Sequence, residues 1–293
     1  MVTAVARFAD LAPRYDAARP QAPAELADVL MQWSGRSEPD VVDVGAGTGL
    51  STVFWVGRAR TVTAVEPGDR MRAVALGRLG LNPDRPAGVL ASSGPAGVLA
   101  SSGPAGGGAE PATARPTAVT VMPGSAEATG LPDECADIVT ASQAMHWFDA
   151  ARALPEIVRI LRPGGIFAAY DYDWPPCIDW ETDQVYAQFD RRVEELETAR
   201  GTRPPHAGKN HLERITGSGL FRYAREIALH SRDTGDAQRI TDLAMTQGGL
   251  AALLAAGATE DELGLTELRE VAARRVASVR TWWWTYRVRI AVK

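Results

Sequence analysis

Apolar and polar positions follow two alternating periods along the first 170 residues. Short runs rich in β-branched residues, typical of buried strands, occur at 41–44, 61–65, 117–122, 136–140 and 166–170. Behind Asp149, a residue type that often caps helices, four apolar residues recur at helical spacing: Leu154, Ile157, Val158 and Leu161. The Pro and two Gly of 162–165 predict the end of that helix. Strands that alternate with helices predict a parallel sheet with right-handed crossovers.

The pattern changes after Asp173. Residues 185–200 predict a helix whose apolar stripe contains Tyr186, Phe189, Val193 and Leu196. Residues 221–229 fit either a sixth strand or a helix. Thr259 and Glu262 have the spacing of a capping box, which predicts a helix running to about Val279. The aromatic and β-branched residues of 282–292 predict a seventh strand. We expect the surrounding helices to cap the carboxyl edge of the sheet.

Residues 86–116 have a composition unlike the rest of the chain. Gly, Ala, Pro and Ser dominate, and residues 87–95 recur directly as 96–104. Such a segment buries too little apolar surface to offset the entropy of ordering it, so we expect a loop without secondary structure. It precedes the third strand and should lie at the amino end of the sheet, opposite the ligand end. Two interpretations remain open: a tolerated expansion without function, and a flexible docking element.

Composition and charge exclude several kinds of partner. Hydrophobic residues make up 45% and charged residues 23% of the chain, as in ordinary globular proteins, and the net charge is −5. That balance gives no reason to expect a nucleic-acid partner. Cys135 and Cys177 form neither a disulfide framework nor a metal cluster. Without a leader-like or membrane-length apolar run, we expect a cytoplasmic protein with no membrane partner. The oligomeric state stays open.

The glycine-rich stretch 41–50 carries the strongest chemical signal. An apolar strand ends there in alternate glycines, Gly45, Gly47 and Gly49, which let a backbone approach a ligand closely. A dinucleotide fingerprint would require glycine at position 50, which is Leu50. A phosphate loop would require a Lys that is absent. Glu66 ends the next strand, where an acid accepts hydrogen bonds from ribose hydroxyls.

These segments resemble the class I S-adenosylmethionine-dependent methyltransferases. The matching residues are 43–49 and 64–67, and 143–149 contains a His-Trp-Phe motif similar to that of the small-molecule branch related to trans-aconitate methyltransferase. The resemblance implies an α/β fold with a Rossmann-like, mainly parallel seven-stranded sheet and a helical cap. It implies an N-terminal helical segment (1–36) over the cofactor, a core (37–173), a cap with the sixth strand (174–280) and a returning last strand (281–293).

The resemblance also implies which residues bind S-adenosylmethionine. The backbone of the glycines and Asp43 would hold the methionine part, Glu66 the ribose, and Gln143 would lie beside the transferable methyl group. Ser125 stands where many relatives carry Asp, which weakens its expected share of adenine recognition. The full predicted set is Tyr15, Asp43, Gly45, Gly47, Gly49, Glu66, Ser125, Ala126, Glu127 and Gln143.

Catalytic and substrate residues are predicted less directly. His146 fits a general base, or a local hydrogen-bonding partner that orients Trp147. Asp171 fits a group that orients the acceptor, or a solvated turn residue. Aromatic side chains that fit either a substrate wall or the core are Trp147, Tyr170, Tyr172 and Trp174. His206, Lys209 and His211 suggest a polar patch in the cap without the partners of a metal site, so we expect no metal.

The predicted function is methyl transfer to an oxygen, nitrogen or carbon atom of a small molecule, with secondary metabolism as one setting. Transfer from a sulfonium needs mainly alignment and exclusion of water. Two alternatives remain: transfer of the aminocarboxypropyl group of the same cofactor, and a cofactor-binding regulator without turnover. Leu50 disfavours a dehydrogenase.

Overall fold

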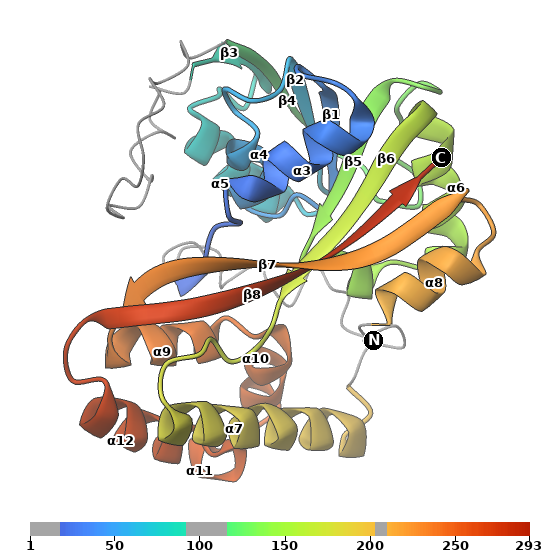
Figure 1. The fold of residues 1–293 in the computed structure, drawn as a ribbon. Coiled ribbons are helices and arrows are strands. Elements are labelled where there is room, and N and C mark those ends of the chain that lie inside the picture. The colour runs from blue at the N-terminus through green and yellow to red at the C-terminus, as the bar shows by residue number, and fades with distance from the viewer. Residues whose placement is uncertain (1–17, 92–115, 203–209) are drawn as a thin grey trace. The chain divides into compact units, whose positions relative to one another are not determined.

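The computed structural model describes residues 18–91, 116–202 and 210–293 (Figure 1). The chain divides into two compact units, each made of three stretches of sequence. The core unit comprises Gln21–Asp171, Gly208–Leu229 and Tyr286–Lys293. The second unit comprises Met1–Pro20, Tyr172–Ala207 and His230–Thr285. Tyr15 of the predicted cofactor site lies outside the described residues.

Among the described residues, eight strands form one sheet in the order β3-β4-β2-β1-β5-β6-β8-β7. Their bounds are β1 Asp40–Val44, β2 Thr61–Val65, β3 Ala87–Leu90, β4 Thr117–Met122, β5 Ala136–Ser142, β6 Leu161–Tyr172, β7 Tyr223–Gly235 and β8 Arg280–Val292. The pairs β1–β2, β1–β5, β2–β4 and β5–β6 are parallel. The predicted Rossmann-like, mainly parallel sheet is therefore confirmed.

The eighth strand corrects the prediction for the low-complexity segment. We predicted seven strands and no element in 86–116, but residues 87–90 form β3, which pairs antiparallel with β4. Backbone hydrogen bonding to the outer edge of β4 explains this strand, because burial does not: Val89 is 70% exposed. Edge pairing needs only N–H and C=O groups, which composition does not reveal. Residues 92–115 lie outside the described part.

The core unit contains five of the described helices and one 3₁₀ turn. These are α3 Glu25–Ser34, α4 Leu50–Phe54, α5 Asp69–Leu79, α6 Ala150–Ile160, α8 His211–Gly217 and η2 Met145–Trp147. Asp149 caps α6 as predicted, since its carboxylate accepts a hydrogen bond from Ala151 N at 3.1 Å. The apolar face of α6 packs into a buried cluster with β1 and β5, so the sheet and this helix share one core.

α6 ends at Ile160, just before the predicted helix terminator at 162–165, but the strand that follows is longer than the predicted 166–170. β6 begins at Leu161, and the β5–β6 register shifts between Ala136 and Ile138. Arg162 forms ion pairs with Asp40 and Asp137, both at 3.0 Å. A Cβ at Gly165 would lie 2.9 Å from the carbonyl oxygen of Arg162, so glycine is required here for close backbone approach.

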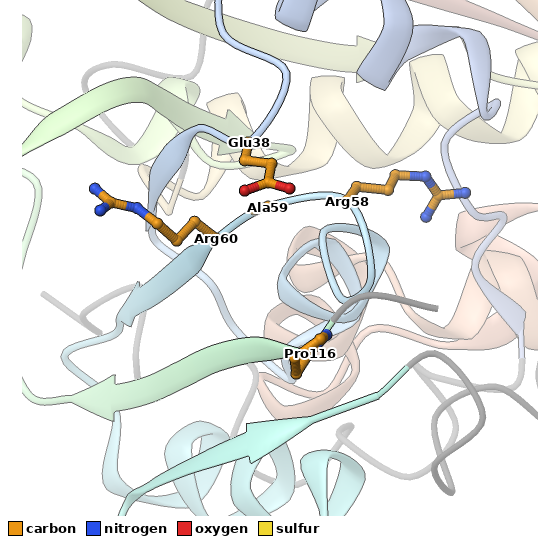
Figure 2. A pocket seen from close by; sticks show the side chains of 5 residues that line it. All are labelled: Glu38, Arg58, Ala59, Arg60 and Pro116. Atoms are coloured by element: carbon orange, nitrogen blue, oxygen red, sulfur yellow. The ribbon is translucent and has the colours of Figure 1, made fainter. Parts of the chain in front are cut away.

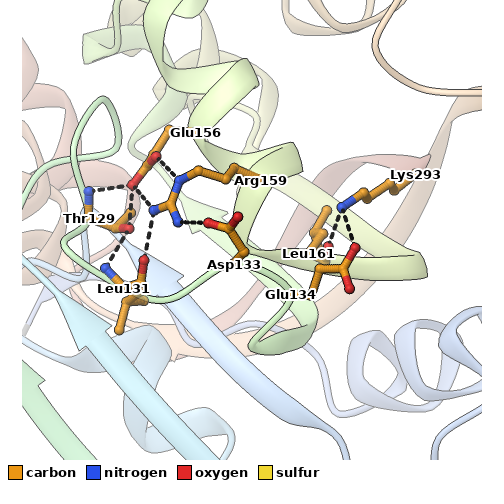
Figure 3. Close-up of polar contacts among 8 residues, drawn as sticks. All are labelled: Thr129, Leu131, Asp133, Glu134, Glu156, Arg159, Leu161 and Lys293. Atoms are coloured by element: carbon orange, nitrogen blue, oxygen red, sulfur yellow. Dashed lines mark hydrogen bonds and ion pairs between the residues drawn. The ribbon is translucent and has the colours of Figure 1, made fainter.

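A polar network fixes α6 to the connection between β4 and β5 (Figure 3). Glu156 accepts hydrogen bonds from the backbone N and the hydroxyl of Thr129 at 2.8 and 2.5 Å. Arg159 donates to Glu156 at 2.7 Å and to the carbonyl oxygen of Leu131 at 2.8 Å. The Arg159 guanidinium, with the two Thr129 donors, lowers the pKa of Glu156 to about 2 against the effect of partial burial.

The second unit contains α7 Trp180–Ala199, α9 Ala237–Met245, α10 Gly248–Ala255, α11 Glu260–Leu263 and α12 Leu265–Arg275. The helix α7 packs against α10, α11 and α12. The capping box of Thr259 and Glu262 is confirmed. The single helix predicted behind it is wrong, because Gly264 adopts a φ of +75° and separates α11 from α12. Residues 223–235 form β7, which decides between the two predictions in favour of a strand.

A small pocket lies where the strands of the core unit begin (Figure 2). Its lining residues precede β1, β2 and β4 and are Glu38, Arg58, Ala59, Arg60 and Pro116. This is the amino end of the sheet, opposite the carboxyl ends at which doubly wound sheets bind ligands. Within the described ranges, no helix combines the length and apolar character needed to cross a bilayer.

Candidate functional site

The reversal of strand order between β1 and β5 marks the candidate site. The run β4-β2-β1-β5-β6 has the order of a doubly wound sheet, and ligands bind beyond the carboxyl ends of the strands at such a reversal. The glycine loop 45–49 follows β1, and Gln143 follows β5. The two connections touch, because a Cβ at Gly45 would lie 2.8 Å from the Cβ of Ala144 and 3.2 Å from Phe148 Cζ.

The glycine loop has a backbone that other residues adopt only with strain. Gly45, Gly47 and Gly49 have φ values of +68°, +57° and +80°. A Cβ at Gly47 would meet no atom within 4 Å, so this peptide faces open space. Gly49 instead packs against α5, since its Cβ would lie 3.1 Å from Ala75 Cβ. The loop therefore combines a packed base with one half-buried, left-handed peptide that borders open space.

Asp43 lies beneath this loop, fully buried. Its Oδ2 accepts hydrogen bonds from the hydroxyls of Ser51 at 2.6 Å and Thr52 at 2.8 Å, and its Oδ1 accepts one from Thr140 at 3.0 Å. Burial raises the pKa of Asp43, and the three hydroxyls act in the opposite direction. The carboxyl group thus fastens α4 and β5 to the end of β1.

Glu66 connects the end of β2 to the glycine loop. It is 7% exposed, and its Oε2 accepts a hydrogen bond from Gly47 N at 3.0 Å while Oε1 accepts one from Gly68 N at 2.8 Å. Burial raises the pKa of Glu66, and the two backbone donors oppose this. The predicted ribose-binding acid and the left-handed Gly47 peptide are therefore in direct contact.

Gln143 is held in an unusual conformation beside this loop. Its φ is +50°, its backbone N donates to Tyr170 O at 2.9 Å, and its buried Nε2 has no hydrogen-bond partner among the described residues. Positive φ in a residue other than glycine is strained and is concentrated at functional sites. An unsatisfied buried amide next to the loop is consistent with a polar ligand group there.

The predicted adenine-side residues lie after β4. Ser125 and Ala128 form an isolated bridge, and Ala126 is buried. Glu127 accepts a hydrogen bond from Asp149 N at 3.0 Å, which ties this turn to the start of α6. Of the predicted cofactor residues, the structure brings Asp43, the three glycines and Glu66 into one connected group, and Ala144, next to Gln143, adjoins it.

The predicted catalytic pair belongs to a larger buried cluster in the core unit. His146 Nδ1 lies 3.7 Å from Asp171 Oδ1, and His211 Nε2 lies 3.1 Å from Asp171 Oδ2. Arg289 donates to Asp171 Oδ2 at 2.8 Å and to Glu226 at 2.6 Å. Burial opposes ionisation of Asp171, but the neighbouring imidazoles hold its pKa below the usual range. This carboxyl group is therefore buried and paired with Arg289, and is not the solvated turn residue that we considered.

Sequence reasoning missed three members of that cluster. We predicted His211 in a polar patch of the cap with His206 and Lys209; those two residues lie outside the described ranges, and His211 is completely buried in the core unit. Arg289 gave a usable signal, because it is a charged residue between the apolar residues Val288 and Ile290 of a strand. Glu226 gave none.

The predicted aromatic residues fall in both units. In the core unit, the ring of Trp147 lies 5.2 Å from that of His146, and Tyr170 is buried. In the second unit, the ring of Tyr172 lies 5.2 Å from Trp174 and 4.9 Å from Trp284. Arg19 lies 4.7 Å above the ring of Trp174 and donates to the Tyr172 hydroxyl.

Comparisons with protein families and solved structures find similarity to methyltransferases. A methyltransferase domain family matches residues 105–169, a range that begins after the glycine loop. In solved structures, a protein from Anaeromyxobacter dehalogenans named as a candidate type II methyltransferase is similar, with 23% identity, a TM-score of 0.58, and 94% of this chain and 97% of that chain covered. A candidate methyltransferase from Bacillus halodurans has 17% identity, a TM-score of 0.50, and coverage of 91% and 98%. These two structures share the fold.

Curated relatives are also methyltransferases by name. An uncharacterized methyltransferase of Mycobacterium tuberculosis is 32% identical over 158 residues, which are 54% of this chain and 49% of the relative. A probable S-adenosylmethionine-dependent methyltransferase of Saccharomyces cerevisiae is 22% identical over 176 residues, which are 60% and 50% of the two chains. The chain spans about half the length of the curated relatives it matches. Over these ranges the chain is similar to methyltransferases, and it shares the Rossmann-like fold of the two solved structures.

Proposed function

We propose that this chain transfers a methyl group from S-adenosylmethionine to a small-molecule acceptor. The observation that carries the proposal is the contact between Glu66 Oε2 and Gly47 N at the carboxyl ends of β2 and β1. It sets an acid for the ribose diol next to an open, left-handed peptide over which the methionine part would pass. Gln143, with its unsatisfied amide, would lie toward the methyl group.

The acceptor would meet the cluster around Asp171. His146 and Asp171 would handle the proton that an oxygen or nitrogen acceptor loses on methylation, with Trp147 as a wall beside them. The His146 imidazole would take that proton as a general base. Tyr170, Tyr172 and Trp174 remain proposed substrate-side residues, and Tyr15, Ser125, Ala126 and Glu127 remain proposed cofactor residues.

Product analysis tests the reaction. The purified chain would be incubated with S-adenosylmethionine and a panel of small carboxylic acids, phenols and amines, and the nucleoside products would be separated by chromatography. Methyl transfer predicts S-adenosylhomocysteine that accumulates only with an acceptor. Methylthioadenosine would contradict methyl transfer, because it is the product of aminocarboxypropyl transfer. Tight cofactor binding without consumption across the panel would favour a regulator.

A further inference from the structure

We propose that His146, Asp171 and His211 bind one divalent transition-metal ion. The ligand atoms of these three side chains lie within 4.8 Å of one another in the core unit. Two imidazole nitrogens and one carboxylate form a common ligand set for zinc, iron and other first-row metals. Metal binding does not depend on the proposed methyl transfer, because it is measured directly.

Unsatisfied buried atoms are the first argument for an ion. Asp171 Oδ1 and both ring nitrogens of His211 are buried without a hydrogen-bond partner among the described residues. His211 Nε2 lies 3.1 Å from Asp171 Oδ2, but the pair is not aligned as a hydrogen bond. A buried polar atom without a partner costs about 1–3 kcal/mol, so three of them in one place require an explanation. A bound cation would satisfy two of these atoms, the carboxylate oxygen and one imidazole nitrogen.

The geometry is close to that of an occupied site. Ligand atoms about 2.1 Å from one ion lie no more than about 4.2 Å apart. The His146–Asp171 and His211–Asp171 separations of 3.7 and 3.1 Å meet this limit. The widest pair of ligand atoms, within 4.8 Å, would close by up to about 0.6 Å to reach this limit and by up to about 1.4 Å for a tetrahedral arrangement. Side-chain rotation of His146, which is 19% exposed, can supply that movement.

The surroundings have the features of an outer ligand shell. Arg289 bonds Asp171 Oδ2 at 2.8 Å and is itself held by Glu226, so the carboxylate is fixed and Oδ1 stays available. Hydrogen bonds of this kind orient metal-ligating carboxylates. Asp171 and Glu226 are balanced in charge by Arg289 and by Arg287, which pairs with Glu226 at 3.3 Å, so a divalent ion adds two positive charges to the cluster. An anionic oxygen ligand would offset part of this charge, so we infer that the open coordination position takes hydroxide or an ionised acceptor hydroxyl.

Direct metal binding tests the site. The full chain would be treated with a chelator and titrated with Co²⁺, followed by visible absorption, and with Zn²⁺ in competition with a colorimetric indicator. We expect one ion per chain with micromolar or tighter affinity, and a rise in Tm on adding Zn²⁺. His146→Ala and Asp171→Asn should each weaken binding at least 100-fold. His230→Ala is the matched control, since His230 is exposed and belongs to the second unit.

Each outcome decides the proposal. Replacement of buried His211 can unfold the chain, so the partly exposed His146 supplies the variant that keeps its fold, as checked by circular dichroism. Loss of one ion per chain in His146→Ala, with His230→Ala unchanged, supports the site. Absence of binding up to millimolar Zn²⁺ would overturn it and leave a hydrogen-bonded cluster. Equal binding in all variants would also overturn it, because the ion would then lie elsewhere.

Discussion

At the scale of single residues, Gly47 offers the sharpest test of the cofactor loop. Its φ is +57° and a Cβ there would meet nothing within 4 Å. Gly47→Ala should therefore fold, with a loss of roughly 1–2 kcal/mol from the left-handed backbone. The added methyl group would occupy the space above the loop, and we expect S-adenosylhomocysteine to bind at least tenfold more weakly in isothermal titration calorimetry.

Gly35 provides a control with the same local properties. It follows α3 with a φ of +66°, and its Cβ would also meet nothing within 4 Å. Gly35→Ala should lose a similar free energy of unfolding while cofactor affinity stays within twofold of wild type. If both variants bind S-adenosylhomocysteine like the wild type, the ligand does not pass over Gly47.

The sequence identified those residues whose predicted role follows from their spacing within one short segment. Gly47 and Glu66 were predicted as partners in one site from a glycine loop and the end of the following strand, and they are in contact. His211 and Arg289 escaped prediction because their contacts with Asp171 depend on how distant segments fold together. No local pattern relates α8 and β8 to the end of β6.

At the scale of elements, the network that holds α6 predicts how the stability of the fold changes at acid pH (Figure 3). The pKa of Glu156 is lowered to about 2 from the model-compound value of 4.5. A carboxyl group with a depressed folded-state pKa stabilises the fold above its unfolded pKa and loses that contribution as pH falls through the folded value. The contribution of Glu156 should therefore be complete above pH 4.5 and decline toward pH 2.

Glu156→Gln should lower the free energy of unfolding at pH 7 by about 1–3 kcal/mol, because Arg159 and Thr129 lose a charged acceptor. Urea unfolding between pH 3 and 7 should also show a shallower decline at acid pH than in the wild type. Glu134→Gln is the control, since Glu134 is a half-exposed residue whose contact with Lys293 is 3.9 Å. An identical pH dependence in both variants and the wild type would contradict the assignment.

Elements driven by side-chain burial were predictable, and those driven by backbone contacts were not. The strands 61–65 and 117–122 have the predicted bounds. The β-branched residues from which we predicted them are the same residues whose burial stabilises them. β3 pairs through its backbone at an edge, and its composition conceals it. The capping box predicted the start of a helix correctly, but Gly264 ends that helix after one turn. The break was not predictable because the surrounding residues keep a helical pattern and only Gly264 adopts a left-handed φ of +75°.

At the scale of the whole molecule, the parallel sheet brings together the loops that carry the predicted chemistry. Its order reverses between β1 and β5, and the three connections that carry the predicted chemistry follow β1, β2 and β5. The acceptor has no comparable signal, because selection of a small molecule depends on side-chain shape and not on a recurring spacing. The contact between the glycine loop and Glu66 was therefore predictable from the sequence, whereas the cluster around Asp171 was visible only in three dimensions.

The most direct test of the central claim is a calorimetric titration of the purified chain with S-adenosylhomocysteine, with NAD as the rival ligand, in wild type and Glu66→Ala. We predict one S-adenosylhomocysteine per chain at micromolar affinity and no measurable binding of NAD. The folded Glu66→Ala variant should bind at least tenfold more weakly, because the ribose diol and Gly47 lose their shared acceptor. Tight NAD binding, or unchanged affinity in the variant, would contradict the assignment of this loop to S-adenosylmethionine.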